Sequence, residues 1–381
     1  MSNSILLAPG PVQLHPEVQK ILSLPMIHHR TPEFDGILKS VLQKLKYLFQ
    51  TEQPVIMQSS TGSGGMESLL INVMNPGDKI LCIVSGKFGE RWADMAEHFG
   101  GKVHRLNVNW GESVSSDAVT DFLKNNPDTA IVMTQACETS TATAHDIQKL
   151  AAIVSQTPAL FLVDGITALG AYPLPMDEWK IDGLVAGSQK AVMLPTGMSF
   201  ISYSARAWKK VESCKSQRFY FDVRKEFAAN KKGETYFSSN VPLIRALDFV
   251  LTRIQEIGID RHFQQLQRRQ KYTLKMAEHL QLEIYSKSPS RSVTALKVPA
   301  GIDGVALREH LEKKYELTVM GGQDHLKGLV LRLGHMGYIT DQHLHQTTER
   351  LAKGLIDFKV ALNLEKVLQQ SEIWLKENPP L

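Results

Sequence analysis

The chain has 381 residues, of which 43% are hydrophobic and 22% are charged, and its formal net charge is +4. This length is enough for two domains, and the composition is typical of a globular protein. The small net charge and the lack of a dense lysine and arginine run argue against nucleic acid as a partner.

Cysteine usage and hydropathy narrow the class further. The three cysteines, Cys82, Cys137 and Cys214, are too few and too scattered for a disulfide framework or a zinc site, so we expect no metal. No run of about 18 apolar residues occurs, so we expect no membrane-spanning helix. The amino-terminal stretch lacks the basic residues of a signal peptide. These features favour the reducing cytoplasm.

The amino-terminal segment predicts an arm followed by two helices. Leu6–Pro11 contains two prolines around a glycine, which favours an extended arm with a turn. A helix is expected from Pro16 to about Ser23. A second should begin with Thr31 as N-cap and Pro32 at the first helical position, and apolar residues at helical spacing continue it to Leu48.

A glycine-rich loop follows the short apolar run Val55–Met57. It reads QSSTGSGG over residues 58–65 and enters a helix over 66–74. Glycines let the backbone approach an anion, and the free N–H groups and dipole of a helix start attract a phosphate. The loop lacks the Lys-Ser/Thr pair of a Walker motif and is not a clean dinucleotide fingerprint. By itself it also suits a merely flexible helix entry.

Strands and helices then alternate to about residue 203. Near-continuous apolar strands between helices indicate a largely parallel sheet covered on both faces, in which ligands bind at the carboxyl ends of the strands. The expected strands are 79–84, 103–108, 130–134, 159–163, 184–186 and 199–203, and the expected helices are 88–99, 116–125 and 146–155.

The second half of the chain changes in pattern. Residues 207–233 read as polar and irregular, and helices are expected over 241–257 and 259–280, the latter with a solvated Arg/Gln face. Beyond about residue 281 the pattern becomes strand, helix, strand, helix, over 293–298, 304–315, 329–333 and 341–362. We therefore expect an arm over 1–20, a large domain over 21–258 and a small α/β domain over 259–381.

One lysine differs from ordinary surface lysines. Lys190 lies between apolar runs in LVAGSQKAVMLPTG (184–197), with no acidic residue within five positions on either side. A desolvated lysine loses part of its preference for the charged form, and its neutral amine can attack a carbonyl. The alternative is a lysine at a strand end with its head in water. Asp164, which ends the strand over 159–163, either caps a helix or points into the same site.

Pyridoxal phosphate requires the residue types that collect at these strand ends. It needs a lysine for the imine, a carboxylate that keeps the pyridine nitrogen protonated, and a cup for the phosphate. Lys190, Asp164 and the glycine-rich loop supply this set. Phe88, at a strand-to-helix turn, adds an aromatic ring for the face of the cofactor.

These motifs together make the chain resemble the class V aminotransferases of fold type I, most closely the alanine–glyoxylate and serine–pyruvate (serine–glyoxylate) group. The resemblance runs from Leu7 to Gly337. The motifs that carry it are APGP at 8–11, HHRTPEF at 28–34, STGSGGME at 60–67, GKFGERW at 86–92, ETST at 138–141, VDGITALG at 163–170, GSQK at 187–190, FYFD at 219–222 and LRLGHMG at 331–337.

The resemblance implies a role for each matching residue around the cofactor. Lys190 carries the internal aldimine and shuttles a proton between the α-carbon of the substrate and C4′ of the cofactor. Asp164 pairs with the pyridinium nitrogen, and Phe88 stacks on the ring. Thr139 approaches the phenolic oxygen of the ring, and Gln189 makes a further phosphate or ring contact.

The resemblance also assigns the two anionic ends of the ligands. Thr61, Gly62 and Ser63 are similar to the phosphate cup, and Arg332 is similar to the arginine that binds the α-carboxylate of the substrate. The partner subunit of a homodimer completes the phosphate site in this family, through a segment that the residues Tyr236, Ser238 and Ser239 resemble. The expected assembly is therefore a homodimer with shared sites, and we expect the arm to cross it. We assign no catalytic role to His28 and His29.

The expected activity is transfer of an amino group from alanine or serine to glyoxylate or pyruvate. An aspartate or broad-specificity transaminase of the same family remains open. A desulfurase or lyase on the same fold is disfavoured, because no cysteine follows Cys214 and Gln189 stands where desulfurases have His. A non-enzyme subunit of this family is disfavoured because Lys190, Asp164 and Arg332 are all present.

Overall fold

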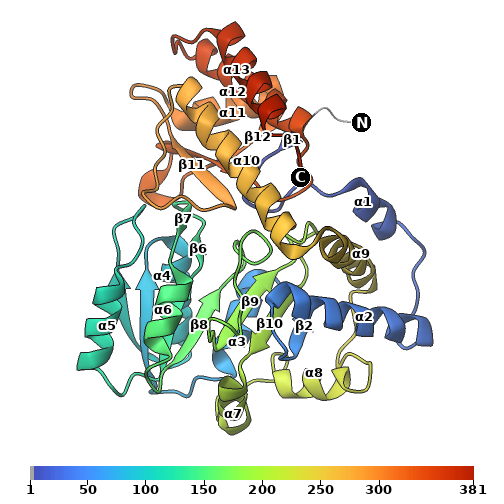
Figure 1. The fold of residues 1–381 in the computed structure, drawn as a ribbon. Coiled ribbons are helices and arrows are strands. Elements are labelled where there is room, and N and C mark those ends of the chain that lie inside the picture. Colours follow the sequence, from blue (N-terminus) through green and yellow to red (C-terminus); the bar gives the residue numbers. More distant parts are fainter. Residues whose placement is uncertain (1–3) are drawn as a thin grey trace.

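A seven-stranded sheet organises the larger part of the chain in the computed structural model, which describes residues 4–381 (Figure 1). Its strands, in spatial order, are β2 (Val55–Gln58), β10 (Ser199–Tyr203), β9 (Gly183–Gly187), β8 (Leu160–Asp164), β5 (Ile131–Gln135), β3 (Lys79–Val84) and β4 (Lys102–Asn107). Strand β10 runs antiparallel to β2 and β9, whereas the other pairs are parallel. The predicted largely parallel sheet is confirmed.

Helices cover both faces of this sheet. One face holds α1 (Pro16–Leu22), α2 (Pro32–Phe49), α5 (Ser116–Asn125), α6 (Ile147–Val154) and α9 (Val241–Ile257), and the other holds α3 (Gly62–Ile71), α4 (Lys87–His98), α7 (Ala205–Ser213) and α8 (Val223–Asn230). Along β3, Leu81 and Ile83 pack with the first set, and Ile80 and Cys82 pack with the second. This alternation is the pleat of a strand buried on both sides.

Local sequence signals fix several helix ends. The hydroxyl of Thr31 accepts a hydrogen bond from Phe34 N at 3.4 Å, and Pro32 occupies the first helical position, as predicted. The prediction was wrong for 207–233, where α7 and α8 form. Ser204 and Asp222 cap these two helices, which are short and bury only two residues each.

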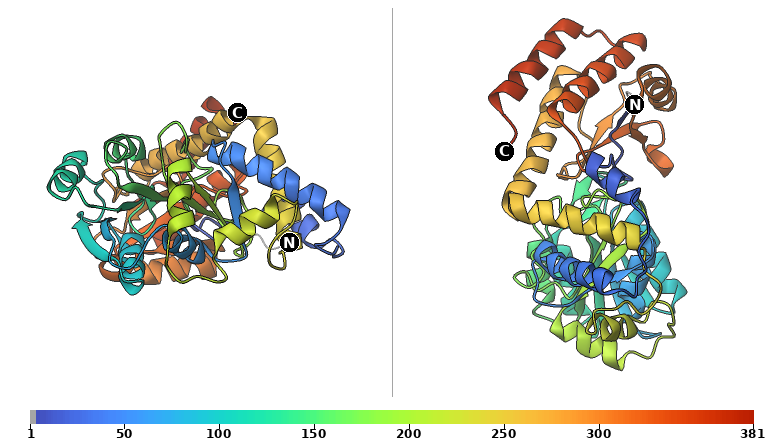
Figure 2. Two further views of the ribbon diagram at one scale, coloured as in Figure 1. Left: turned by 90° about the horizontal axis from the view of Figure 1, so that it is seen from below. Right: turned by 90° about the vertical axis from the view of Figure 1, so that its right-hand side faces the viewer.

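The carboxyl-terminal part forms a second layer around its own core. A three-stranded antiparallel sheet has the order β11 (Val293–Lys297), β14 (Val330–Gly334), β13 (Met320–Gly321). Around it lie α10 (Ile259–His279), α11 (Gly304–Tyr315), β12 (Leu317–Thr318), the 3-10 turn η1 (Asp324–Leu326), α12 (Asp341–Asp357) and α13 (Leu364–Glu377). Figure 2 shows α10 leading from α9 into this part. The exact division into 1–20, 21–258 and 259–381 stays a prediction.

Two expectations about the carboxyl-terminal helices were wrong. The helix expected over 341–362 ends at Asp357, where Lys359 takes a left-handed conformation with φ 68°, and Asn363 then caps α13. The Arg/Gln face of α10 is not simply solvated. Arg269 is enclosed and donates to the carbonyls of His335, Gly337 and Ile339, because these loop carbonyls need donors where no water reaches them.

The amino-terminal arm lies against the small sheet of its own chain. Strand β1 (Ile5–Leu6) pairs in parallel with β12, and Gly334 N donates to Leu7 O at 2.7 Å. Ile5 and Leu7 join the core of the carboxyl-terminal part. Beyond β1 the arm continues toward the large sheet, where the Pro9 carbonyl contacts Lys190 in the turn after β9 (Figure 1).

Candidate active site

The predicted site residues collect at the carboxyl ends of neighbouring strands. Lys190 follows β9, Asp164 is the last residue of β8, and Phe88 lies in the first turn of α4, after β3. Each of Lys190 and Asp164 shifts the pKa of the other through its charge, so the two groups face a common region. The crossover geometry of a parallel sheet explains this convergence.

The Lys190 amine is buried and held by the arm. The residue is 8% exposed, and its Nζ donates to the carbonyl of Pro9 at 2.7 Å. Gly10 packs so closely that a Cβ there would lie 2.6 Å from Nζ. Burial lowers the pKa of the Lys190 amine to about 8, so roughly a tenth of it is uncharged at pH 7, far more than for an ordinary lysine. A neutral buried amine is a nucleophile and a proton carrier.

Asp164 is a buried carboxylate with one backbone donor. Its Oδ1 accepts from Ile166 N at 2.8 Å. Burial raises the pKa of Asp164 to about 7, and the nearby charge of Glu138 raises it further. A cationic ring nitrogen beside this carboxyl would favour its ionised form, which is the pairing that a protonated pyridine needs.

Glu138 is a site residue that the sequence analysis quoted in a motif without giving it a role. It lies in the two-residue strand β6 (Cys137–Glu138), which pairs with β7 (Thr143–Ala144). Its Oε2 accepts from Phe88 N at 3.1 Å and Gly89 N at 3.0 Å, and its Oε1 accepts from the N–H and hydroxyl of Ser140. It therefore caps α4, whose N-cap Gly86 has no side chain. The available signal was an isolated acidic residue, since no other Asp, Glu, Lys or Arg lies between Asp128 and Asp146.

The glycine-rich loop forms the start of α3. Thr61 is the N-cap, and its hydroxyl accepts from Gly64 N at 3.4 Å. A Cβ on Gly62 would lie 2.8 Å from Cδ1 of Ile166, so this position has no room for a side chain. Arg91 Nη1 donates to the Ser63 hydroxyl at 3.2 Å. A helix start with an arginine beside it suits a phosphate.

Phe88 and Thr139 both lie next to Glu138, Phe88 through its backbone N–H and Thr139 as the following residue of the chain. The guanidinium carbon of Arg91 is 5.0 Å from the centre of the Phe88 ring, which is half-buried. The Thr139 hydroxyl donates to Thr167 Oγ1 at 2.8 Å. Both side chains are thus fixed by neighbours before any ligand contact.

Arg332 reaches this region from the carboxyl-terminal part. Its Nε donates to Gly321 O and its Nη1 donates to Thr139 O, each at 2.9 Å. Burial lowers the pKa of the Arg332 guanidinium, and the charge of Glu138 acts against this. Within the described residues, Nη2 makes no hydrogen bond and is available for a carboxylate.

Unpartnered polar atoms test whether the cofactor fits. Oε1 of Gln189 and both polar atoms of the Gln135 side chain are buried without a hydrogen-bond partner among the described residues. Gln135 lies opposite Asp164 in the sheet register, and Gln189 precedes Lys190. Buried amides without partners are costly, so a ligand with polar atoms belongs here. The amine, carboxylate, phosphate cup and free amides fit pyridoxal phosphate.

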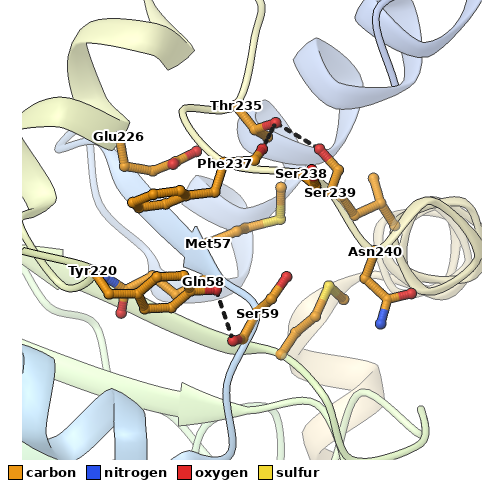
Figure 3. Close-up of a pocket in the computed structure, with 12 residues that line it drawn as sticks. Met57, Gln58, Ser59, Tyr220, Glu226, Thr235, Phe237, Ser238, Ser239 and Asn240 are labelled. Carbon is orange, nitrogen blue, oxygen red and sulfur yellow. Dashed lines mark hydrogen bonds between the residues drawn. The ribbon is translucent and has the colours of Figure 1, made fainter. Parts of the chain in front are cut away.

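The residues predicted for the partner's phosphate lie elsewhere. Ser238 and Ser239 line a cavity of about 30 Å³ beside β2 and Tyr220, and Lys190 and Asp164 do not line it (Figure 3). Ser239 Oγ is 2.6 Å from Thr235 Oγ1. Tyr236 is 44% exposed. The chain therefore does not bring these three residues to its own Lys190.

His28 and His29, which we gave no catalytic role, stack on each other with ring centres 4.6 Å apart. Among residues 4–381, no group of three or more His, Cys, Asp or Glu side chains is arranged to hold a metal ion. In the same range, no helix is both long and apolar enough to cross a bilayer.

Comparison with known proteins identifies the family. The sequence profile of the family Aminotransferase class-V matches residues 15–339. The chain belongs to the class V aminotransferases. It is therefore a transaminase of fold type I that uses pyridoxal 5′-phosphate, and the family that its motifs resemble is confirmed.

Named relatives cover nearly the whole chain. The L-aspartate–glyoxylate aminotransferase of Paracoccus denitrificans is 32% identical over 89% of this chain and 88% of its own. The serine–glyoxylate aminotransferase of Methylorubrum extorquens is 29% identical over 98% of this chain and 96% of its own. A Synechococcus protein named soluble hydrogenase small subunit is 33% identical over 90% of both chains.

A solved structure shows the same fold. The alanine–glyoxylate aminotransferase of Nostoc sp. superposes with a TM-score of 0.89 at 28% identity, over 93% of this chain and 96% of that one. The predicted architecture, a large domain with a mostly parallel sheet between helices and a smaller α/β domain, is confirmed.

Proposed function

We propose that this aminotransferase transfers the amino group of alanine or serine to glyoxylate or pyruvate in a ping-pong reaction. The observation that carries the proposal is the convergence of one buried amine, Lys190, with Asp164 and with Arg332 from the other part of the chain. The serine–glyoxylate and alanine–glyoxylate enzymes among the related proteins support the choice of substrates.

Lys190 is the proton carrier in this proposal. Bound pyridoxal phosphate supplies the electron sink that stabilises negative charge at the α-carbon of the substrate. With a pKa of about 8, the Lys190 amine can take the α-proton as a neutral base and return it at C4′ of the cofactor. The hydrogen bond from the Lys190 amine to the Pro9 carbonyl must break when the amine binds the cofactor.

The other residues orient the cofactor. Asp164 holds the proton on the ring nitrogen, Phe88 covers one face of the ring, and Thr139 donates toward its phenolic oxygen. Thr61, Gly62 and Ser63 bind the phosphate at the start of α3, and Gln189 adds a further contact. Glu138 positions Phe88 through the N–H groups of α4.

Arg332 binds the α-carboxylate of the amino acid and of the oxo acid. Its Nε and Nη1 are anchored on backbone carbonyls, so the guanidinium has one orientation when the substrate arrives. Closure of the carboxyl-terminal part over the site excludes water from the reacting atoms.

Aspartate is the second candidate donor, in a broad-specificity transaminase. Arg91 favours it, because this exposed guanidinium lies above the Phe88 ring and forms no ion pair within residues 4–381, so a second carboxylate can pair with it. The aspartate–glyoxylate relative points the same way. A desulfurase is disfavoured because all three cysteines are buried. A non-enzyme role is disfavoured by the intact set of Lys190, Asp164 and Arg332.

We further propose a homodimer with shared sites in the cytoplasm. Tyr236, Ser238 and Ser239 lie away from their own Lys190, and Phe219 beside them is 72% exposed, so this surface suits a second copy whose phosphate site it completes. Three free cysteines without disulfides suit a reducing compartment.

A donor panel tests the substrate proposal. Alanine, serine and aspartate are each mixed with the holoenzyme, and loss of its visible absorbance is followed before glyoxylate, pyruvate or 2-oxoglutarate is added. Alanine or serine should react fastest and glyoxylate or pyruvate should restore the spectrum. A clear preference for aspartate would select the second candidate, and the Arg91→Gln variant should then lose more activity with aspartate than with alanine, whereas loss of a phosphate contact would affect both donors alike.

A further inference from the structure

A cavity with both apolar and basic walls lies behind the turn that carries Lys190. It has a volume of about 230 Å³ and is walled by Ala191 and Met193 of that turn, by α9 and α10, by His15 of the arm and by residues 337–339. The arm, the large sheet layer and the carboxyl-terminal part all meet here. None of the catalytic residues proposed above lines it.

The ionisable residues of this cavity are all basic. His15, Arg253, His262 and Arg269 line it, and no aspartate or glutamate does. Arg269 donates to three backbone carbonyls, and the nearby Asp341 is engaged by Arg268 at 2.6 Å. Arg269 is half-buried and Arg253 is exposed, so the cavity presents two guanidinium groups and no carboxylate among its lining residues, a charge balance that favours an anionic ligand.

His262 supplies an independent observation that points to a ligand. The residue is 7% exposed, and its Nε2 is buried without a hydrogen-bond partner among the described residues. Burial and the charge of Arg269 lower the pKa of His262 to about 4, and a hydrogen bond with the backbone at Gly170 acts against this. The ring is thus neutral at pH 7, and the nitrogen left over accepts a hydrogen bond.

The chemistry of the walls defines the ligand. Two guanidinium groups require oxygen atoms that carry negative charge, whereas Nε2 of His262 requires a donor. Monohydrogen phosphate and phosphate monoesters present both at once, because one phosphoryl oxygen can carry a proton. Sulfate and simple carboxylates carry no proton at neutral pH.

We propose that this cavity is a phosphate-binding site, separate from the phosphate cup at α3, which accepts inorganic phosphate or a small phosphate monoester between Arg253, His262 and Arg269. Arg253 is exposed at its mouth, so a ligand can enter from solvent. Because three parts of the chain form the walls, the bound anion ties the arm and the carboxyl-terminal part to the turn after Lys190.

Binding to the holoenzyme tests this inference, because the cofactor then fills the α3 cup. Equilibrium dialysis with radiolabelled inorganic phosphate should show one additional site per chain, and phosphate should raise the melting temperature, with a rise that continues as the logarithm of its concentration above the Kd. Sulfate should bind about 10-fold more weakly, the loss expected for one hydrogen bond to a charged group. Glycerol phosphate, run in parallel, distinguishes a monoester from free phosphate as the tighter ligand.

Variants locate the site. Arg253→Gln and His262→Phe should each weaken phosphate binding by about 10-fold or more, whereas Arg261→Gln, an exposed arginine of α10 that does not line the cavity, should leave it unchanged. The visible spectrum of the cofactor shows that each variant is folded. Absence of any phosphate site beyond the cofactor, equal binding by all variants, or tighter binding of sulfate than phosphate would each overturn the proposal.

Discussion

The turn after β9 separates two regions with opposite charge balance. On the side of Lys190, a single buried amine faces the carboxylate of Asp164, and the charge of Glu138 in turn raises the pKa of Asp164. On the other side, Arg253 and Arg269 line a cavity with two histidines and no carboxylate. Ala191 joins the two regions, because it follows Lys190 and lines the cavity.

The difference shows how the cost of burying charged groups is offset in each region. The catalytic region holds charges of both signs: burial lowers the pKa of the Lys190 amine, and the charge of Asp164 acts against this. The cavity behind the Lys190 turn, called the rear cavity below, is lined by two guanidinium groups and no carboxylate. A negative charge that balances them must come from a ligand. The first arrangement suits reaction and the second suits binding.

Removal of the amine has the largest expected effect on the catalytic side. Lys190→Ala should lower the rate of transamination by about 10⁴-fold or more and abolish covalent attachment of the cofactor. Turnover assays and the visible spectrum check this. Lys149→Ala, on the exposed side of α6, is the control and should behave as wild type. Normal turnover by Lys190→Ala would rule out its assigned role.

Neutralising one carboxylate tests the charge balance itself. Asp164→Asn keeps an acceptor for Ile166 N but removes the negative charge, so the ring nitrogen loses its counter-ion. The rate should fall by about 100- to 1,000-fold, with bound cofactor retained. Asp146→Asn, at the cap of α6, controls for the substitution. Wild-type rates in Asp164→Asn would show that this charge is not used.

Arg332 tests the link between the two parts of the chain. Arg332→Lys keeps a positive charge but cannot form the fork that binds a carboxylate. The KM for both amino acid and oxo acid should rise by about 10- to 100-fold, because hydrogen bonds to a charged group are lost. Steady-state kinetics measure this, and Arg308→Lys on α11 is the surface control. An effect on one substrate alone would contradict a shared carboxylate site.

Glu138 tests whether the cap of α4 depends on a charge. In the wild-type chain, both carboxylate oxygens of Glu138 accept from backbone N–H donors. Glu138→Gln replaces one oxygen with an NH₂ group, which cannot accept from these donors. The apoenzyme should lose about 1–3 kcal/mol of unfolding free energy, which urea denaturation can measure. Glu283→Gln, a surface residue paired with Lys297, should change little. Unchanged stability in Glu138→Gln would mean that α4 does not need this cap.

The last expected effect is an acid sensitivity near Arg269, whose guanidinium donates to the His335 carbonyl. Burial lowers the pKa of His335 to about 3, below its value in the unfolded chain, so the unfolded state binds more protons between about pH 6.5 and 3. The unfolding free energy should therefore fall as pH drops through this window. At pH 5 the loss from His335 is roughly 2 kcal/mol, and His335→Asn should show that much less acid loss in urea titrations at pH 7 and 5. An equal loss in both proteins would contradict the shifted pKa.

Local signals made much of the fold predictable. Apolar strands bounded by turns gave the sheet, and Thr31 with Pro32 gave the start of α2. The helices α7 and α13 were not predicted, because each is short of buried residues, with Ala207 and Val211 in α7 and Val367 and Ser371 in α13. Periodicity shows a helix only when one face is broadly apolar.

The site residues that lie directly at the end of a strand could be predicted from the sequence. Lys190, Asp164 and Phe88 could be placed from strand ends alone. Glu138 could not be given its role, because its partners are backbone N–H groups some 50 residues away. The rear cavity was equally hidden, since Arg269 reads as part of a solvated helix face until its contacts are known. Burial depends on tertiary packing, which a single sequence shows only indirectly.

The hydrogen bond from Lys190 to the Pro9 carbonyl makes the beginning of the chain a neighbour of a lysine 181 positions away. Since the acceptor belongs to the main chain, no side-chain substitution at position 9 deletes it, whereas proteolytic trimming past that point does. The next residue, Gly10, is equally constrained: a Cβ there would lie 2.6 Å from Nζ, so any larger residue at position 10 should displace the reactive nitrogen.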